Sequence, residues 1–137
     1  MSQKVMFRHC DPAGIVFFPK YFEMINDCVE GFFAEVLLLP FEVLLKTGGV
    51  PTVSISTDFK APSFHGDELG LALTPMKLGN SSMQLKICGS CDGQLRFTSQ
   101  STLVFVDNIG RPTPWPLEIK KVVGEIITSR IGIEHGK

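Results

Sequence analysis

Residues 8–22 read RHCDPAGIVFFPKYF, and this stretch predicts a tight turn followed at once by a helix. Pro12 has a fixed φ and disfavours helical geometry at Asp11, so the chain is expected to be extended there. Gly14 allows a positive φ or a close approach of the backbone to a ligand. Pro19 fits the first position of a helix, where no backbone N–H is needed. The stretch therefore places a carboxylate on a turn just before a helix N-terminus.

This juxtaposition suits the hydrolysis of an acyl compound. A carboxylate can attack a carbonyl carbon or activate a water molecule. The free N–H groups of a helix N-terminus can hydrogen-bond the oxyanion that then develops. The alternative interpretation is structural, because an aspartate in such a turn often only hydrogen-bonds its own backbone.

The run CDPAGIVFFPKYF (residues 10–22) resembles the active-site segment of the hotdog-fold acyl-CoA thioesterases, specifically the 4-hydroxybenzoyl-CoA thioesterase family. The match covers the acid, the Pro-Ala-Gly that follows it, the apolar run and the Pro-x-Tyr helix start. A weaker similarity in element order and length extends over most of the chain. The resemblance implies that Asp11 is the catalytic carboxylate, as nucleophile or general base. It also implies that the backbone N–H of Phe18 is the oxyanion donor.

Three further residues are implied to bind substrate. Gly14 would let the backbone approach the ligand, and Phe17 would help to wall the acyl pocket. The 4-hydroxybenzoyl-specific enzyme holds the ring hydroxyl with an aspartate on its central helix, and spacing from Asp11 places Asn26 at that position. The basic residues that this family uses for the nucleotide phosphates are not recovered in the turn at 78–82. From the family resemblance we expect an aromatic or a short-to-medium acyl-CoA substrate. We expect no metal and no cofactor besides the coenzyme A carried by the substrate.

The rest of the chain predicts one long helix and an antiparallel sheet. Apolar residues recur at helical spacing over 19–39, and Pro40 ends that pattern. A short helical turn follows at 41–46, and a C-terminal helix is expected over 117–127. Gly79-Asn80 and Asp92-Gly93 are hairpin signals that make neighbouring strands antiparallel. Strands are expected at 3–9, 52–59, 68–77, 81–90 and 94–106.

These elements indicate an α+β protein, with the sheet wrapped around a long, largely buried helix. One sheet on one helix leaves edge strands uncovered, so a partner surface is needed. The resemblance implies the hotdog fold, whose domains form homodimers, often pair again into homotetramers, and carry the active site at the dimer interface. We expect a single domain over residues 1–137.

Composition narrows the possible functions. The formal net charge is −1 and 20% of residues are charged, with no basic cluster, which argues against nucleic acid as a partner. The longest aliphatic run near the end of the predicted helix is Val36 to Leu39, too short to span a membrane, so we expect a cytoplasmic protein. The Cys88-Gly89-Ser90-Cys91 sequence precedes a hairpin turn and has no second ligand pair, so neither a zinc nor a redox site is expected.

Two alternatives stay open on the same fold. A hydratase or dehydratase acting on an acyl thioester would use a histidine with an acid, and only His9 lies near the predicted helix start. A non-catalytic acyl-CoA binding module would keep the pocket without turnover. His65 and Glu30 are interpreted as surface residues, and Cys10 as a poor candidate nucleophile because no base is paired with it.

Overall fold

Within residues 1–135 the chain forms a five-stranded antiparallel sheet with the strand order β1-β3-β4-β5-β2. The computed structural model describes residues 1–135, with side chains described as far as residue 130. The strands are β1 (Ser2–Lys4), β2 (Thr52–Phe59), β3 (Glu68–Leu78), β4 (Ser82–Cys91) and β5 (Gln94–Val104). The helices are α1 (Pro19–Glu35), α2 (Phe41–Leu44) and α3 (Leu117–His135).

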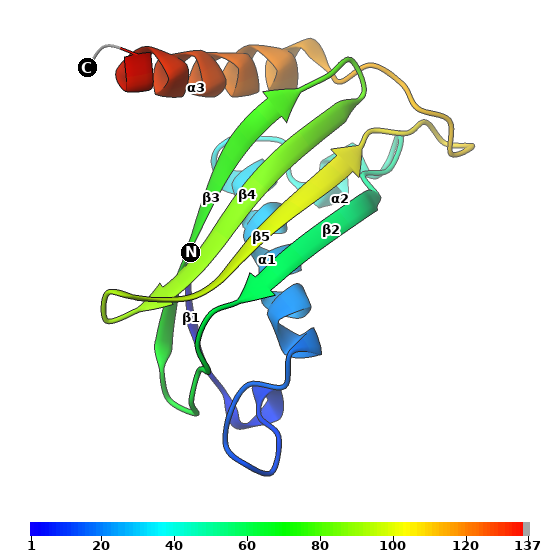
Figure 1. Ribbon diagram of the computed structural model, residues 1–137. Helices are drawn as coiled ribbons and strands as arrows, with labels where there is room; N and C mark the ends of the chain where they lie inside the picture. The colour runs from blue at the N-terminus through cyan, green and yellow to red at the C-terminus, as the bar shows by residue number, and fades with distance from the viewer. Residues whose placement is uncertain (136–137) are drawn as a thin grey trace.

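Helix α1 lies against one face of the sheet (Figure 1). Residues on β4 alternate, with Met83, Leu85 and Ile87 fully buried beneath the helix while the residues between them face outward. On the helix, Met24, Ile25, Val29 and Phe33 are among those that complete this core. The expected α+β architecture, a sheet wrapped around a long central helix, is confirmed.

Helix α1 starts at Pro19, as predicted, but it ends at Glu35 rather than at residue 39. Leu38 has a φ of 54°, in the left-handed region, and the Leu39 N–H returns to the Phe33 carbonyl at 2.9 Å. The helical geometry is lost here because Leu39 precedes Pro40, and a residue before proline is pushed out of the α region. Apolar periodicity alone placed the boundary one turn too late.

The predicted strand over 3–9 was also too long. Strand β1 covers only Ser2–Lys4, and a 3₁₀ helix occupies Phe7–His9. The change has a local cause, because the His9 ring accepts a hydrogen bond from the Met6 N–H at its own Nδ1, at 2.9 Å. This contact closes a short turn that a strand could not make.

The two hairpin turns lie where Gly79-Asn80 and Asp92-Gly93 predicted them. In the β4–β5 turn, Asp92 and Gly93 have φ values of 52° and 77°, the positive pair that a two-residue hairpin needs. Helix α3 begins at Leu117 as expected but extends to His135, beyond the predicted end at 127. It lies across the end of the sheet near the β3–β4 turn, with Ile119 and Val123 fully buried (Figure 1).

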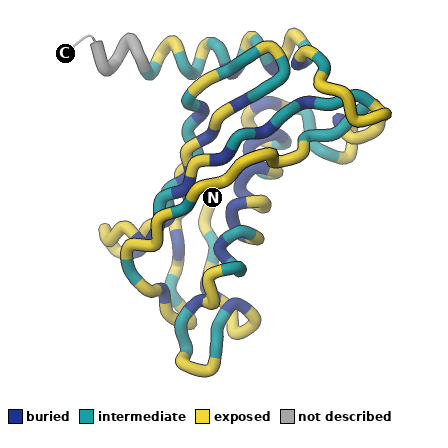
Figure 2. The backbone as a smooth tube through the Cα atoms, turned by 45° about the vertical axis from the view of Figure 1, so that its right-hand side comes forward, coloured by how far each residue is buried: buried dark blue, intermediate teal, exposed yellow. Residues whose placement is uncertain are grey.

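Strand β2 forms an open edge of the sheet. It pairs with β5 on one side and is exposed along nearly its whole length (Figure 2). Val53 is 58% exposed, Ile55 42% and Phe59 48%, although all three are large and apolar. An edge of this length and composition is a surface that a second strand can cover.

Candidate active site

Asp11 lies in a small hairpin formed by residues 10–16, just before α1, and this segment is at the lower end of the molecule in Figure 1. Cys10 and Val16 pair across it, and the Asp11 N–H donates to the Ile15 carbonyl at 2.9 Å. The Gly14 N–H donates to the Asp11 carbonyl at 3.0 Å, with Gly14 at a φ of 82°. The turn needs this positive φ, which explains why a glycine stands three residues after the acid.

The hairpin orients the Asp11 carboxylate through only one of its oxygens. Oδ1 accepts the Ala13 N–H at 2.9 Å and lies 3.4 Å from the Ile15 nitrogen. Oδ2 has no hydrogen-bond partner among the described residues, and the side chain is half-buried. Oδ1 therefore hydrogen-bonds the backbone of its own turn, as the structural interpretation predicts, whereas Oδ2 is available to contact a water molecule or a ligand.

The start of α1 supplies a backbone N–H without a partner. The Phe17 N–H donates to the His9 carbonyl at 2.9 Å, whereas the Phe18 N–H has no acceptor anywhere in the described part of the chain. Phe18 is the N-cap residue of the helix, where the helix dipole favours negative charge. This is the property that an oxyanion donor requires.

Aromatic rings line the same end of α1. Phe17 contacts Phe18, Phe18 contacts Phe59 on β2, and Phe59 stacks on Tyr21, with centroid separations of 5.6, 6.0 and 5.7 Å. Phe17 and Phe18 are each about half exposed. The row of rings therefore reaches from the hairpin to the open edge of the sheet, where it can contact a flat acyl group.

Asn26 lies apart from this group within a single chain. It lines an open cavity of about 590 Å³ between α1 and β2, together with Glu30, Ile55 and Ser101. Eight residues along a helix correspond to about 12 Å, so Asn26 is far along α1 from Phe18. One chain thus brings Asp11, Gly14, Phe17 and Phe18 to one end of the helix but does not bring Asn26 to them.

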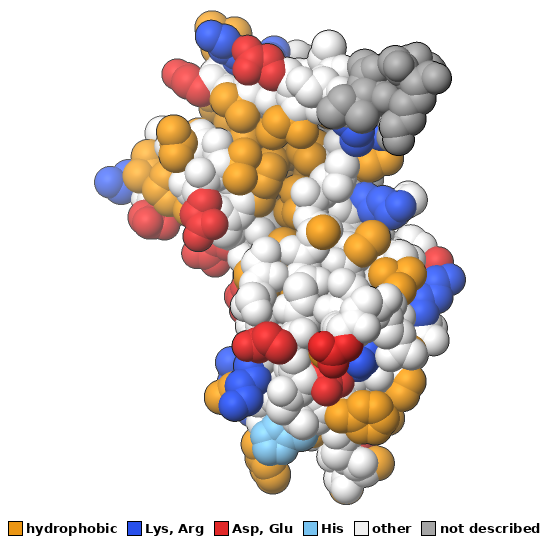
Figure 3. Space-filling view, turned by 90° about the vertical axis from the view of Figure 1, so that its left-hand side faces the viewer, with side chains coloured by type: hydrophobic (Ala, Val, Ile, Leu, Met, Phe, Trp, Pro, Cys, Tyr) orange, Lys and Arg blue, Asp and Glu red, His pale blue; other side chains and the backbone are white. Residues whose placement is uncertain are grey.

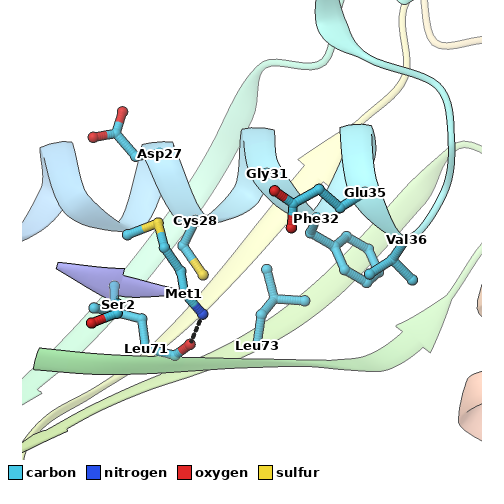
Figure 4. A pocket seen from close by; sticks show the side chains of 10 residues that line it. All are labelled: Met1, Ser2, Asp27, Cys28, Gly31, Phe32, Glu35, Val36, Leu71 and Leu73. Carbon is cyan, nitrogen blue, oxygen red and sulfur yellow. Dashed lines mark hydrogen bonds between the residues drawn. The ribbon is translucent and has the colours of Figure 1, made fainter.

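A second cavity, of about 560 Å³, opens on the opposite side of α1, next to β3. Its floor is formed by Phe32, Leu71 and Leu73, while Asp27 and Glu35 stand at its rim (Figure 4). Figure 3 shows apolar side chains gathered in this hollow below α3. None of the predicted site residues lines it.

His9 is only 3% exposed and does not point into the hairpin as a free base. Its Nδ1 accepts the Met6 N–H, and the Arg8 guanidinium lies 3.0 Å from its Nε2. Burial and, to a smaller extent, the Arg8 charge lower the pKa of His9 below its usual value of 6.5. The ring is therefore held neutral as a structural part of the turn.

The cysteines and acidic groups in the described part of the chain are not arranged as metal ligands. Cys88 and Cys91 are free thiols on β4, not at a helix N-terminus. Within the described chain, no three His, Cys, Asp or Glu side chains gather in a group that could hold a metal ion. No helix within residues 1–135 is both long and apolar enough to cross a lipid bilayer.

Sequence reasoning missed the segment that supports the hairpin. Residues 62–67 run beside it, and the buried Tyr21 hydroxyl donates to the Ser63 Oγ at 2.9 Å. These partners are 42 positions apart in the sequence, so no local pattern could reveal them.

Comparison with known proteins shows the family to which the chain belongs. Residues 5–123 match the Thioesterase-like superfamily, and the chain belongs to that family. It is 33% identical over 72 residues to a 4-hydroxybenzoyl-CoA thioesterase of Pseudomonas sp. (strain CBS-3), covering 50% of this chain and 51% of the relative. It is 30% identical over 87 residues to a 1,4-dihydroxy-2-naphthoyl-CoA hydrolase of Trichodesmium erythraeum (strain IMS101), covering 59% of each. The chain thus matches between half and three fifths of these two relatives.

Among solved structures, the gentisyl-coenzyme A thioesterase BH1999 superposes with a TM-score of 0.82 at 26% identity. That comparison covers 88% of this chain and 98% of the other. The superposition confirms the hotdog fold expected from the sequence.

Proposed function

We propose that this protein is an acyl-CoA thioesterase that hydrolyses an aromatic or short-to-medium-chain acyl-CoA to the free acid and coenzyme A. The observation that carries the proposal is that two groups on the segment leading into α1 have no hydrogen-bond partner among the described residues, the Asp11 Oδ2 and the Phe18 N–H. Membership of the Thioesterase-like superfamily and the hydroxyaryl-CoA substrates named for two of its relatives support the same chemistry.

Hydrolysis can follow either of two routes from this arrangement. As a general base, Asp11 takes a proton from water while the water oxygen attacks the thioester carbonyl carbon. As a nucleophile, the free Asp11 oxygen attacks that carbon and forms a mixed anhydride, which water then cleaves. In both routes the carbonyl oxygen becomes an oxyanion hydrogen-bonded to the Phe18 N–H, and the C–S bond breaks to release coenzyme A as the thiolate. The thiolate then takes a proton from protonated Asp11 in the general-base route, or from water in the nucleophilic route.

We infer that the working unit contains at least two copies of the chain. The open edge of β2, with its exposed apolar residues, can be covered by a second β2 to form one continuous sheet. The cavity lined by Asn26 opens toward the same side and would then be closed by the partner. We propose that a homodimer, or a homotetramer built from two of them, completes the site by placing the partner's Asn26 near an acyl group bound at Asp11. We propose no metal and no cofactor apart from the coenzyme A of the substrate.

The buried, neutral His9 disfavours the hydratase alternative. Its Nδ1 is occupied by the Met6 N–H, so that nitrogen cannot act as the base for water addition. A binding module without turnover would need neither the free Asp11 oxygen nor the unpartnered Phe18 N–H.

The test is thiol release from a panel of CoA esters, comprising benzoyl, 4-hydroxybenzoyl, phenylacetyl and short and long aliphatic groups. We expect turnover by the wild type and a loss of about 10² or more in Asp11→Asn. Asp92→Asn is the matched control, since it makes the same change in the exposed β4–β5 turn, where asparagine tolerates the positive φ. Equal turnover in wild type and Asp11→Asn, with the fold intact, would refute the proposed mechanism. Tight binding of CoA esters without turnover would favour the binding module.

A further inference from the structure

The segment 62–67, between β2 and β3, forms one side of the hairpin that carries Asp11. The Val16 N–H donates to the Ser63 carbonyl at 2.9 Å, and the His65 N–H donates to the Gly14 carbonyl at 3.2 Å. Ile15 and Phe64 form an antiparallel bridge between these two bonds. The position of the hairpin is therefore set by this neighbouring segment as well as by its own turn.

One buried side chain holds both ends of that segment. Arg96 projects from β5, and its Nη1 donates to the Asp67 Oδ2 at 2.7 Å and to the Pro62 carbonyl at 3.0 Å. The same Asp67 oxygen accepts the Phe64 N–H at 2.9 Å. The Phe64 N–H and the Arg96 guanidinium together lower the pKa of Asp67, so the carboxylate stays charged.

The burial of Arg96 argues against a role in stability alone. Its side chain is 8% exposed, and its buried Nε has no hydrogen-bond partner in the described structure. A buried ion pair with an unsatisfied donor gains little over an apolar residue of the same volume. What the guanidinium supplies is one nitrogen, Nη1, that bonds two acceptors at once, which an apolar side chain of the same volume cannot do.

We propose that Arg96 is a positioning residue for thioester hydrolysis, fixing segment 62–67 and through it the hairpin that aims the Asp11 carboxylate. This role rests on the proposed function of Asp11. Arg96 itself does not touch the substrate. Its effect is transmitted by the backbone bonds of Ser63 and His65 to Val16 and Gly14.

The first test measures kcat and KM for the best CoA ester with Arg96→Met and Arg96→Lys. Misplacing a catalytic group by about 1 Å can reduce the rate roughly 10²-fold. We therefore expect kcat to fall about 10- to 100-fold in Arg96→Met, with KM within about twofold of wild type. Arg96→Lys should recover part of kcat, because one ammonium group can still bond Asp67. Asp67→Asn carries the same test if Arg96→Met does not fold.

A stability control separates positioning from general loosening. Val123→Ala removes buried methyl groups from α3, far from the hairpin, and should lower Tm without lowering kcat. Hydrogen exchange supplies a direct readout, since the amides of Val16 and His65 should exchange faster in Arg96→Met but not in Val123→Ala.

The double variant Arg96→Met/Asp11→Asn decides whether the effect passes through Asp11. If it does, Arg96→Met should not reduce further the residual turnover of Asp11→Asn. Wild-type kcat in folded Arg96→Met, or a full additional loss in the double variant, would overturn the role of Arg96 while leaving the proposed function intact. Wild-type turnover in Asp11→Asn alone would overturn the proposed function and this role together.

Discussion

Replacing Gly14 by alanine tests whether the geometry of the turn controls the reactivity of Asp11. Gly14 has a φ of 82°, and no heavy atom lies within 4 Å of where a Cβ would be added. The substitution therefore introduces backbone strain without a steric clash. A residue with a Cβ in the left-handed region is destabilised by about 1–2 kcal/mol.

That strain translates into a measurable melting shift. With about 2.1 cal/mol/K of unfolding entropy per residue, a chain of 137 residues has about 0.29 kcal/mol/K, so Tm should fall by about 3–7 °C. Relief of the strain requires a change in φ at Gly14, which would break the Gly14 N–H bond to the Asp11 carbonyl. We expect the displaced carboxylate to lower kcat roughly 10²-fold.

Gly110→Ala is a matched control. Gly110 has a φ of 83° and also has no heavy atom within 4 Å of the added Cβ, but it lies between β5 and α3. Both variants should lose similar stability, measured by calorimetry, whereas only Gly14→Ala should lose turnover of the CoA ester. Equal Tm losses with unchanged kcat in Gly14→Ala would refute the conclusion that this turn positions Asp11.

Two further predictions concern pH and assembly. Because the pKa of His9 is lowered in the folded protein, the unfolded state takes up a proton first as the pH falls below 6.5. The free energy of unfolding should therefore decrease below pH 6.5, whereas the contribution of His9 is fully present above that pH. Urea titrations between pH 5 and 8 should show this slope in wild type and a smaller one in His9→Gln; equal slopes would contradict the assignment of a buried neutral ring. Ile55→Lys places a charge on the open edge of β2 and should shift the mass measured by light scattering toward one chain, whereas Gln100→Lys on β5 should not. An unchanged mass in Ile55→Lys would exclude that edge as the dimer contact.

Local sequence signals predicted the parts of the fold that depend on neighbouring residues. Pro19 marked the start of α1, and Asp92-Gly93 marked a hairpin, because each restricts its own backbone angles. The end of α1 was missed because apolar spacing continued through Leu39 after the geometry had changed. The strand predicted over 3–9 was shortened by a side-chain bond from His9 that no propensity describes.

In the candidate site, too, the sequence predicted contacts between neighbouring residues and missed those between distant ones. Asp11, Gly14 and Phe18 lie within eight residues of one another, so a short motif could predict that they share one end of a helix. Their catalytic and binding roles, like those of Phe17 and Asn26, stay predictions. The contact between Arg96 and Asp67 spans 29 positions and joins strand β5 to the loop that precedes β3, so only the folded chain could reveal it.

Because of the strand order, β2 is synthesised well before the strand that pairs with it. β2 is completed at Phe59, but its partner is β5, whose far end at Leu103 pairs with Thr52. At about 5–20 residues per second, synthesis leaves β2 without its partner for roughly 2–9 s. During that interval a strand rich in β-branched residues is available to other nascent chains. Asp58 and Lys60 flank its apolar end with charge, and Pro51 precedes it, so the sequence itself discourages premature pairing on the ribosome.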